Sequence, residues 1–408
     1  MPADQSPSPN PHPTSQRLSQ RQVWILTLAA AVVTANAYYI HPIIARVADD
    51  FGVSAAMIGI VPAFNQIALA LGIFLLLPLG DRFSNRTLST IFVWGQFFSI
   101  ALMAISGGFV WFVIGSTLLG FATIVPYLLP TYVSKRVEPG ELGRVTAVLT
   151  TGIIAGILVA RAGAGVVGEY LGWRSVYYIA SALMLLVAIL LPMTMDRREA
   201  SAATETEDTS YFALLGSMLP LIGKYPEILL SGTIQALSFG TFLSIWMGLG
   251  LHLTSPDMGY GVDVVGYLAL LAIVNVFTTP RFGAFADRFG PRRTRLIAAG
   301  FRLFGVTLFL FFGHSLWLLI IPIVITNIFG PVMDVSTRMT FLSESPQIRT
   351  RLMTVYIVFM FVGGGLASWA GTAIYDLHGW TGNAVLALVM TVIVGLLSLF
   401  SYLRYERN

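Results

Sequence analysis

The residues of this sequence that could do chemistry are a few charged and titratable side chains inside long apolar segments. Arg161 follows the apolar run GIIAGILVA, His41 lies in NAYYIHP, and Asp334 precedes Arg338 by four residues. A charge at membrane depth is costly, so each of these residues is a candidate for binding or proton transfer. An arginine can bind an anionic or polar group of a substrate. A histidine or an aspartate can carry a proton, which makes His41 and Asp334 the candidate proton-coupling residues.

Each of these residues also has a purely structural interpretation. Arg161 could bind an anionic or polar group, or it could pair with a carboxylate or extend towards the outer lipid head groups. His41 could carry a proton, or it could be a hydrogen-bonded histidine near the outer interface. Asp334 could titrate as a proton carrier, or it could form an ion pair with Arg338 on the next helical turn. The residue types alone leave these alternatives open.

Further polar and aromatic residues in the apolar segments extend the candidate binding site. Amide side chains can bond a substrate or join neighbouring helices, and aromatic rings suit an amphipathic molecule but also pack well. The candidate substrate-binding residues are Asn36, Tyr39, Asn65, Gln66, Tyr127, Arg161, Gln235, Trp246 and Asn327.

The composition shows which solvent these segments need. The 408-residue chain is 56% hydrophobic and 11% charged, whereas soluble domains carry roughly 25% charged residues. Its apolar runs are continuous, as in LWLLIIPIVITNIF, and do not alternate as barrel strands do. The lipid bilayer is therefore the expected partner, crossed by helices. The absence of cysteine excludes disulfides and thiolate metal sites, and the net charge of +4 indicates basic cytoplasmic loops rather than a nucleic-acid partner.

Twelve apolar spans can be distinguished, and the distribution of basic residues orients them. They begin near Val23, Met57, Leu88, Val110, Val145, Ser175, Glu227, Val264, Arg295, Ser315, Leu352 and Gly382. With both termini cytoplasmic, all but four of the 24 Lys and Arg residues (Arg46, Arg161, Arg174 and Arg302) fall on the cytoplasmic side, as the positive-inside rule requires.

These spans predict an all-α membrane protein with five parts. They are a disordered cytoplasmic N-terminus (1–22), a first six-helix bundle (23–195), a cytoplasmic linker with a possible amphipathic helix (196–226), a second six-helix bundle (227–403) and a cytoplasmic tail (404–408).

A recurring charged tag indicates that the two bundles are repeats of one unit. LGDRFSNRT (79–87) is followed about half a chain later by ADRFGPRRT (286–294). The pairs Arg144 and Arg351, EYLGW (169–173) and DLHGW (376–380), and Gly156 and Gly363 share one common offset. Parallel repeats of this kind predict two pseudo-symmetric bundles related by an axis along the membrane normal.

With these motifs the sequence resembles the major facilitator superfamily over nearly its whole length after Gln22. The family signature G-x-x-x-D-R-x-G-R-R follows span two, with a weaker copy after span eight. Here the second copy fits better, whereas the first has Leu77 and Ser84 in place of glycines. The sequence is most similar to the twelve-helix drug–proton antiporter branch.

The resemblance implies that the charged tags gate one side of the membrane. An aspartate can sit against the positive N-terminus of a helix from the other bundle, and nearby arginines can pair with carboxylates or carbonyls. Asp81 would then face the start of span eleven, and Asp287 the start of span five. The alternative is that these loops only signal topology. The candidate gating residues are Asp81, Arg82, Arg86, Gly283, Asp287, Arg288, Arg292, Arg144 and Arg351.

The sequence also departs from that branch. Arg161 stands where antiporters carry the proline of a Gly-Pro pair, and Ser116 stands where the family often has an arginine before Gly120. Spans one, two, four, seven and eight have no acidic residue at mid-membrane depth. Arg302 falls in span nine, which is peripheral in the family, and is therefore expected to extend along lipid.

We therefore expect a secondary transporter that moves a small organic molecule by alternating access, with proton-coupled efflux as the leading mode. The alternatives are an uptake symporter or facilitator of an anionic metabolite and, more remotely, a membrane sensor. No GxxxxGK[ST] signature occurs and the five histidines are scattered, so neither direct ATP use nor enzymatic activity is expected. We expect no cofactor or metal ion, a monomer, and location in a bacterial inner membrane.

Overall fold

The computed structural model describes residues 18–196, 211–216, 220, 223–341 and 346–405, and this part of the chain contains helices and no strand. The first half comprises α1 (Gln20–Ala35), α2 (Ile40–Phe51), α3 (Ala55–Ile58), α4 (Ile60–Leu76), η1 (Leu77–Asp81), α5 (Asn85–Ile105), α6 (Phe109–Ala122), α7 (Val125–Ser134), α8 (Pro139–Tyr170) and α9 (Trp173–Thr194). The short α10 (Tyr211–Gly216) precedes the second half, which comprises α12 (Pro226–Leu253), α13 (Val262–Ala269), η2 (Leu270–Ile273), α14 (Val274–Phe289), α15 (Pro291–Phe312), α16 (Leu316–Met339) and α17 (Pro346–Tyr405).

Within the described residues, eleven helical stretches are long and apolar enough to cross a membrane. The last of them, in α17, contains Gly379 with φ of 59° and ψ of −155°, a left-handed conformation that favours glycine and ends the helical path. This break divides α17 into two membrane-spanning arms. The prediction of an all-α membrane protein with twelve transmembrane helices is thereby confirmed.

Two of the spans are interrupted in mid-membrane by prolines. Pro42 has no N–H to donate to the carbonyl of Tyr38, so α1 and α2 are separated by a turn at residues 36–39. Pro126 likewise cannot donate to Ala122, and α6 ends at that residue. The first interruption matters for function, because it places Tyr38 and His41 at a bend in the helix.

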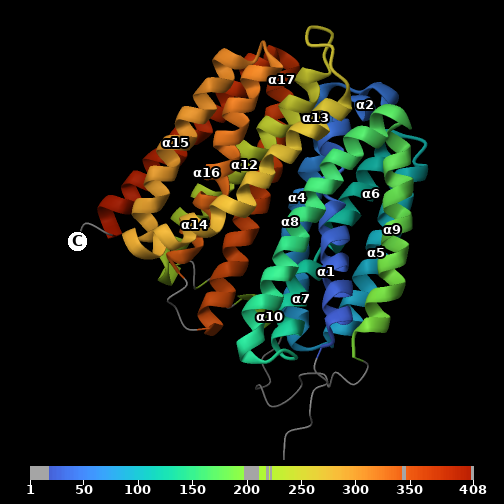
Figure 1. Cartoon of the computed structure of the whole chain (residues 1–408), viewed down its shortest axis with the longest axis vertical. Coiled ribbons are helices and arrows are strands. Elements are labelled where there is room, and N and C mark those ends of the chain that lie inside the picture. Colours follow the sequence, from blue (N-terminus) through green and yellow to red (C-terminus); the bar gives the residue numbers. More distant parts are fainter. Residues whose placement is uncertain (1–17, 197–210, 217–219, 221–222, 342–345, 406–408) are drawn as a thin grey trace, which may run out of the picture.

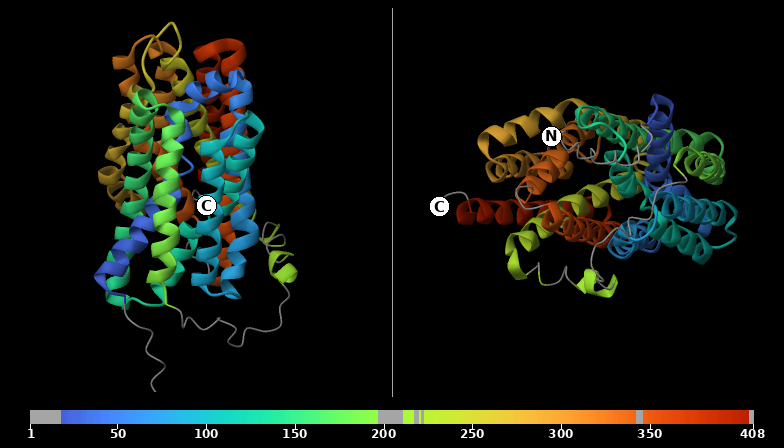
Figure 2. Two further views of the ribbon diagram at one scale, coloured as in Figure 1. Left: turned by 90° about the vertical axis from the view of Figure 1, so that its right-hand side faces the viewer. Right: turned by 90° about the horizontal axis from the view of Figure 1, so that it is seen from below.

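The two halves lie side by side as separate helical bundles, seen from the side in Figure 1 and from below in Figure 2. The start of α1, α7 and α10 lies at the lower end in Figure 1, and we name this end the terminal face. The ends of α2 and α8 and the start of α13 lie at the upper end, which we name the opposite face.

Glycine contacts show that the two bundles are built alike. A Cβ atom at Gly156 of α8 would lie 2.6 Å from the carbonyl oxygen of Ala31 in α1. A Cβ atom at the equivalent Gly363 of α17 would lie 2.8 Å from the Cα atom of Ala236 in α12. Each bundle therefore packs its fifth span closely against its first, as expected for membrane helices joined through small residues.

The bundles make closer contact at the opposite face than along the terminal half of α8. A Cβ atom at Gly165 of α8 would lie 2.7 Å from the carbonyl oxygen of Val262 and 2.9 Å from the Cα atom of Gly266 in α13. Towards the terminal face the α8 residues Thr146, Ala147, Thr150 and Thr151 are exposed. The two halves thus meet through α8 and α13 at one face and leave α8 accessible towards the other.

Candidate functional site

Arg161 lies in α8 at the boundary between the two bundles. Its side chain is buried, with 2% of its surface exposed, and its guanidinium carbon lies 3.6 Å from the centroid of the Trp246 ring. The same carbon lies 5.6 Å from the ring of Phe242, one helical turn earlier in α12. A cation on an aromatic face in a desolvated place is stabilised by about 2 kcal/mol. Arg161 therefore contributes a contact that joins one bundle to the other.

The guanidinium of Arg161 carries donors that the protein does not use. Within the described part of the chain, Nε and Nη2 are buried without a hydrogen-bond partner, and no carboxylate forms an ion pair with this arginine. An unpaired buried charge costs several kcal/mol, which is more than the aromatic contact returns. The sequence alternatives of a carboxylate pair and of an extension to the head groups therefore do not match this geometry.

Tyr38 and His41 complete the surroundings of Arg161 from the bend between α1 and α2. Both lie close enough to Arg161 to interact with its charge. Their rings contact edge to face, with centroids 5.1 Å apart. His41 is 1% exposed, and among the described residues neither of its ring nitrogens has a partner. We name Arg161, Tyr38, His41, Phe242 and Trp246 the Arg161 cluster.

A second polar group lies on α16 and the first arm of α17. Asp334 forms an ion pair with Arg338 at 2.9 Å, and it accepts a hydrogen bond of 2.7 Å from the hydroxyl of Tyr356. The guanidinium carbon of Arg338 lies 5.4 Å from the ring of Tyr356. Tyr127 of α7, in the other bundle, lies within electrostatic range of Asp334, Arg338 and Tyr38. The pair predicted from the i, i+4 spacing is present, and a role for Asp334 in proton transfer stays a prediction.

Two of the candidate binding residues bond within the first bundle. Asn36 donates to Oε1 of Gln96 at 3.0 Å, and Gln96 in turn donates to Thr123 at 2.5 Å. Asn65 donates to the carbonyl oxygen of Ser116 at 2.8 Å. These bonds join helices of the first bundle to one another.

The remaining candidates are buried at other helix contacts. Tyr39 lies in a buried apolar cluster that contains residues of both bundles, and Gln66 contacts Gly365 across the two bundles. Gln235 donates to the Met360 sulfur at 3.5 Å, and Asn327 is 4% exposed. A binding role for each of them stays a prediction.

Three of the candidate gating residues form hydrogen bonds or ion pairs with residues of their own bundle. Arg86 donates to the carbonyl oxygen of Pro192 at 2.9 Å, and Arg292 holds both carboxylate oxygens of Glu227 at 2.8 Å. Arg144 forms an exposed ion pair with Glu141 at 3.1 Å.

The other gating candidates differ in exposure. Arg82, Asp287 and Arg288 are exposed, Arg351 is half-buried, and a Cβ atom at Gly283 would meet open space. The side chain of Asp81 lies outside the described part. Their gating roles stay predictions.

Arg302 differs from the sequence-based expectation. It is buried, and its guanidinium donates to the hydroxyl and to the carbonyl oxygen of Ser238 in α12. The expectation that it extends along lipid was wrong, because α12 presents Ser238 as an internal partner.

The opposite face contains a contact between bundles that no motif indicated. Glu169, at the end of α8, accepts a hydrogen bond of 2.9 Å from the backbone N–H of Val262, the first residue of α13. Its other oxygen accepts from Arg46 at 2.9 Å. A carboxylate at a helix N-terminus satisfies a free N–H and interacts well with the helix dipole. The acid in EYLGW was recognised only as part of the repeat.

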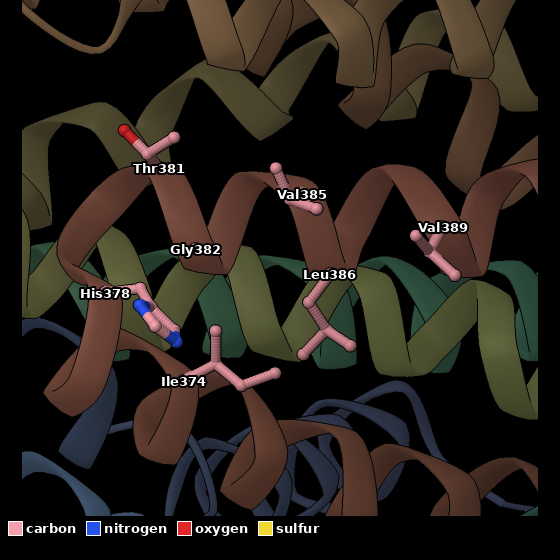
Figure 3. A pocket seen from close by; sticks show the side chains of 7 residues that line it. All are labelled: Ile374, His378, Thr381, Gly382, Val385, Leu386 and Val389. Atoms are coloured by element: carbon pink, nitrogen blue, oxygen red, sulfur yellow. The ribbon is translucent and has the colours of Figure 1, made fainter.

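A hollow of about 610 Å³ lies on α17 and is separate from these groups. Figure 3 shows the residues that line it, which are Ile374, His378, Thr381, Gly382, Val385, Leu386 and Val389. The lining comes from the two arms of α17 alone and contains no member of the Arg161 cluster, so this hollow is not the candidate site.

Comparison with known proteins identifies the family and relatives of this chain. A profile of the major facilitator superfamily matches residues 26–302 and 228–408. The uncharacterized transporter YgaY of Escherichia coli O157:H7 is 26% identical over 380 residues, which cover 92% of this chain and 95% of that protein. A probable transporter of Streptomyces coelicolor is 25% identical over 369 residues, which cover 89% of this chain and 83% of that protein.

Solved structures show the same fold. A mutant of the nucleoside transporter NupG superposes with a TM-score of 0.76 at 15% identity, covering 94% of this chain and all of that one. A bacterial homologue of the human lysosomal transporter Spinster, in an inward-facing and unoccupied conformation, also reaches 0.76 at 14% identity, covering 95% and 97%. The family profile spans both bundles, and the chain therefore belongs to the major facilitator superfamily.

Proposed function

We propose that this transporter moves a small organic molecule by alternating access of the Arg161 cluster to the two faces. The observation that carries the proposal is the contact of Arg161 in one bundle with Trp246 in the other, at 3.6 Å. A site shared by two bundles changes its exposure when the bundles rock, which is how inverted and parallel repeat transporters work. The units are residues 23–195 and 227–403, joined by the linker 196–226.

The contacts of α8 along its length support this proposal. Glu169 and Gly165 hold α8 against α13 at the opposite face, whereas α8 is exposed towards the terminal face. The basic residues predict that the terminal face is cytoplasmic. We place the protein as a monomer in a bacterial inner membrane.

The leading mode is proton-coupled efflux, as in the drug–proton antiporter branch. His41 and Asp334 are the residues we assign to proton coupling. The second candidate is uptake or facilitated movement of an anionic metabolite, which the unpaired Arg161 favours.

The test uses inside-out vesicles with an acid lumen and a pH-sensitive dye. A panel of amphipathic amines and aromatic carboxylates is added to vesicles with and without the protein. Proton-coupled efflux predicts that at least one compound collapses the gradient only when the protein is present. Counterflow of the same labelled compounds, without a gradient, tests facilitation.

A matched pair of tryptophan variants tests whether the shared site carries transport. Trp246→Leu removes the ring under Arg161, whereas Trp317→Leu removes a ring that is 76% exposed on α16. We expect transport to fall in the first variant and to persist in the second. Equal transport in both variants would contradict the site, and no movement of any compound in either assay would contradict the function.

A further inference from the structure

We propose that the Arg161 cluster binds an aromatic carboxylate, whose anionic group supplies the counter-charge that Arg161 lacks within the protein. This inference rests on the proposed transport function and specifies the class of substrate.

Nε and Nη2 of Arg161 can together bind one carboxylate, and we name these two donors the carboxylate fork. Nε and Nη2 point from the same edge of a guanidinium, so together they can bind both oxygens of one carboxylate. This chain uses the same edge elsewhere, because Arg292 binds the two oxygens of Glu227 through its Nε and Nη2, each at 2.8 Å. In Arg161 both atoms are buried and have no partner among the described residues.

The charge around Arg161 excludes a cationic ligand group at this point. The titratable side chains that interact with the charge of Arg161 are Tyr38 and His41. No ion pair between a described carboxylate and Arg161 is present. A cation placed there would face a buried positive charge without screening, whereas an anion would neutralise it. His41 adds one ring N–H that can donate to an anion, since neither of its ring nitrogens has a partner among the described residues.

The rings of the cluster determine the rest of the ligand. Trp246 is buried beneath the guanidinium, whereas Tyr38 and Phe242 are only half-buried. The Phe242 ring lies 5.6 Å from the guanidinium carbon. Aromatic rings favour offset or edge-to-face contacts with other rings. A short aliphatic acid would leave the exposed ring surface without a partner. An aromatic or similarly flat apolar body attached to the carboxylate fits both parts of the cluster.

The experiment measures ligand-induced thermal stabilisation of the purified full-length protein in detergent. The probes are benzoate, phenylacetate, 1-naphthoate and indole-3-acetate, with their primary amides and with acetate at equal ionic strength. A ligand that binds only the native state raises the unfolding temperature with increasing concentration. We expect at least one aromatic carboxylate to raise it, and its amide and acetate to leave it unchanged.

Three variants assign the response to the carboxylate fork. Arg161→Gln removes the fork, and we expect the apparent Kd to rise at least about tenfold, as for loss of a charge-assisted bond. Arg161→Lys keeps the charge without the fork and is expected to bind with intermediate affinity. Arg174→Gln removes an arginine that pairs with Asp50 at 2.7 Å, outside the cluster, and should respond like the unchanged protein.

The proposal is overturned if none of the four carboxylates stabilises the protein, if an amide stabilises it as well as its acid, or if Arg161→Gln keeps the full response. Gradient collapse by amines or neutral compounds alone would also reject the anionic class, while it would support the transport function. The two proposals therefore fail by different results.

Discussion

Replacing Arg161 by methionine should raise the stability of the ligand-free protein, which is unusual for a buried arginine. The guanidinium is 2% exposed, has unpartnered Nε and Nη2 atoms, and pairs with no carboxylate among the described residues. Burial of such a charge costs several kcal/mol. Its contact with Trp246, at 3.6 Å, returns about 2 kcal/mol. Methionine keeps a long apolar side chain, so the net change in unfolding free energy should be a gain of about 1 kcal/mol or more.

Arg292→Met is the matched control, because Arg292 binds both oxygens of Glu227 at 2.8 Å. This variant leaves a partly buried carboxylate without its main partner and should lose about 1–3 kcal/mol. Reversible unfolding in mixed micelles of a mild detergent and sodium dodecyl sulfate measures both variants against the unchanged protein. A loss of stability in Arg161→Met, similar to that in Arg292→Met, would show that Arg161 is neutralised inside the protein and would refute the reasoning.

Three further perturbations test the contacts between the bundles and the second polar group. Glu169→Ala removes the hydrogen bond of 2.9 Å from the Val262 N–H, so a cysteine placed at Ala162 should react faster with an impermeant maleimide added at the opposite face. The chain has no native cysteine that would react as well. An unchanged labelling rate would show that this bond does not hold the two bundles together. Gly165→Val inserts side-chain atoms where Val262 and Gly266 approach α8, whereas Gly163→Val inserts them into open space. Transport should therefore be lost in the first variant and kept in the second. Equal transport activities would contradict a close approach of the helices at this face. Asp334→Asn removes the charge that faces Arg338, Tyr356 and Tyr127. Gradient-driven transport should fall at least about tenfold while counterflow continues. A parallel fall in both assays would show that Asp334 has a structural role rather than a role in proton coupling.

Much of the fold follows from local properties of the sequence. Long apolar runs must become helices in lipid, because no water is present to bond their backbone groups. Pro42 and Pro126 interrupt their spans at positions that follow from the missing N–H. The common offset of Gly156 and Gly363 predicted two similar bundles, and both glycines pack against the first span of their own bundle. These features depend on neighbours in sequence or on the solvent, so they can be read without the tertiary structure.

The partners of the polar residues depend instead on which helices meet, and apolar spans carry little information about their neighbours. Sequence reasoning identified Arg161, Trp246 and His41 separately, but their assembly requires α8, α12 and the bend before α2 to converge. It misplaced Arg302, because nothing in the sequence shows that Ser238 lies opposite it. It also missed the bond between Glu169 and Val262, because a backbone N–H at a helix start is present in every helix and has no residue signature. The sequence by itself determined that a charge is buried in the membrane, and only the packing of the two bundles decided that this charge has no counter-charge within the described protein.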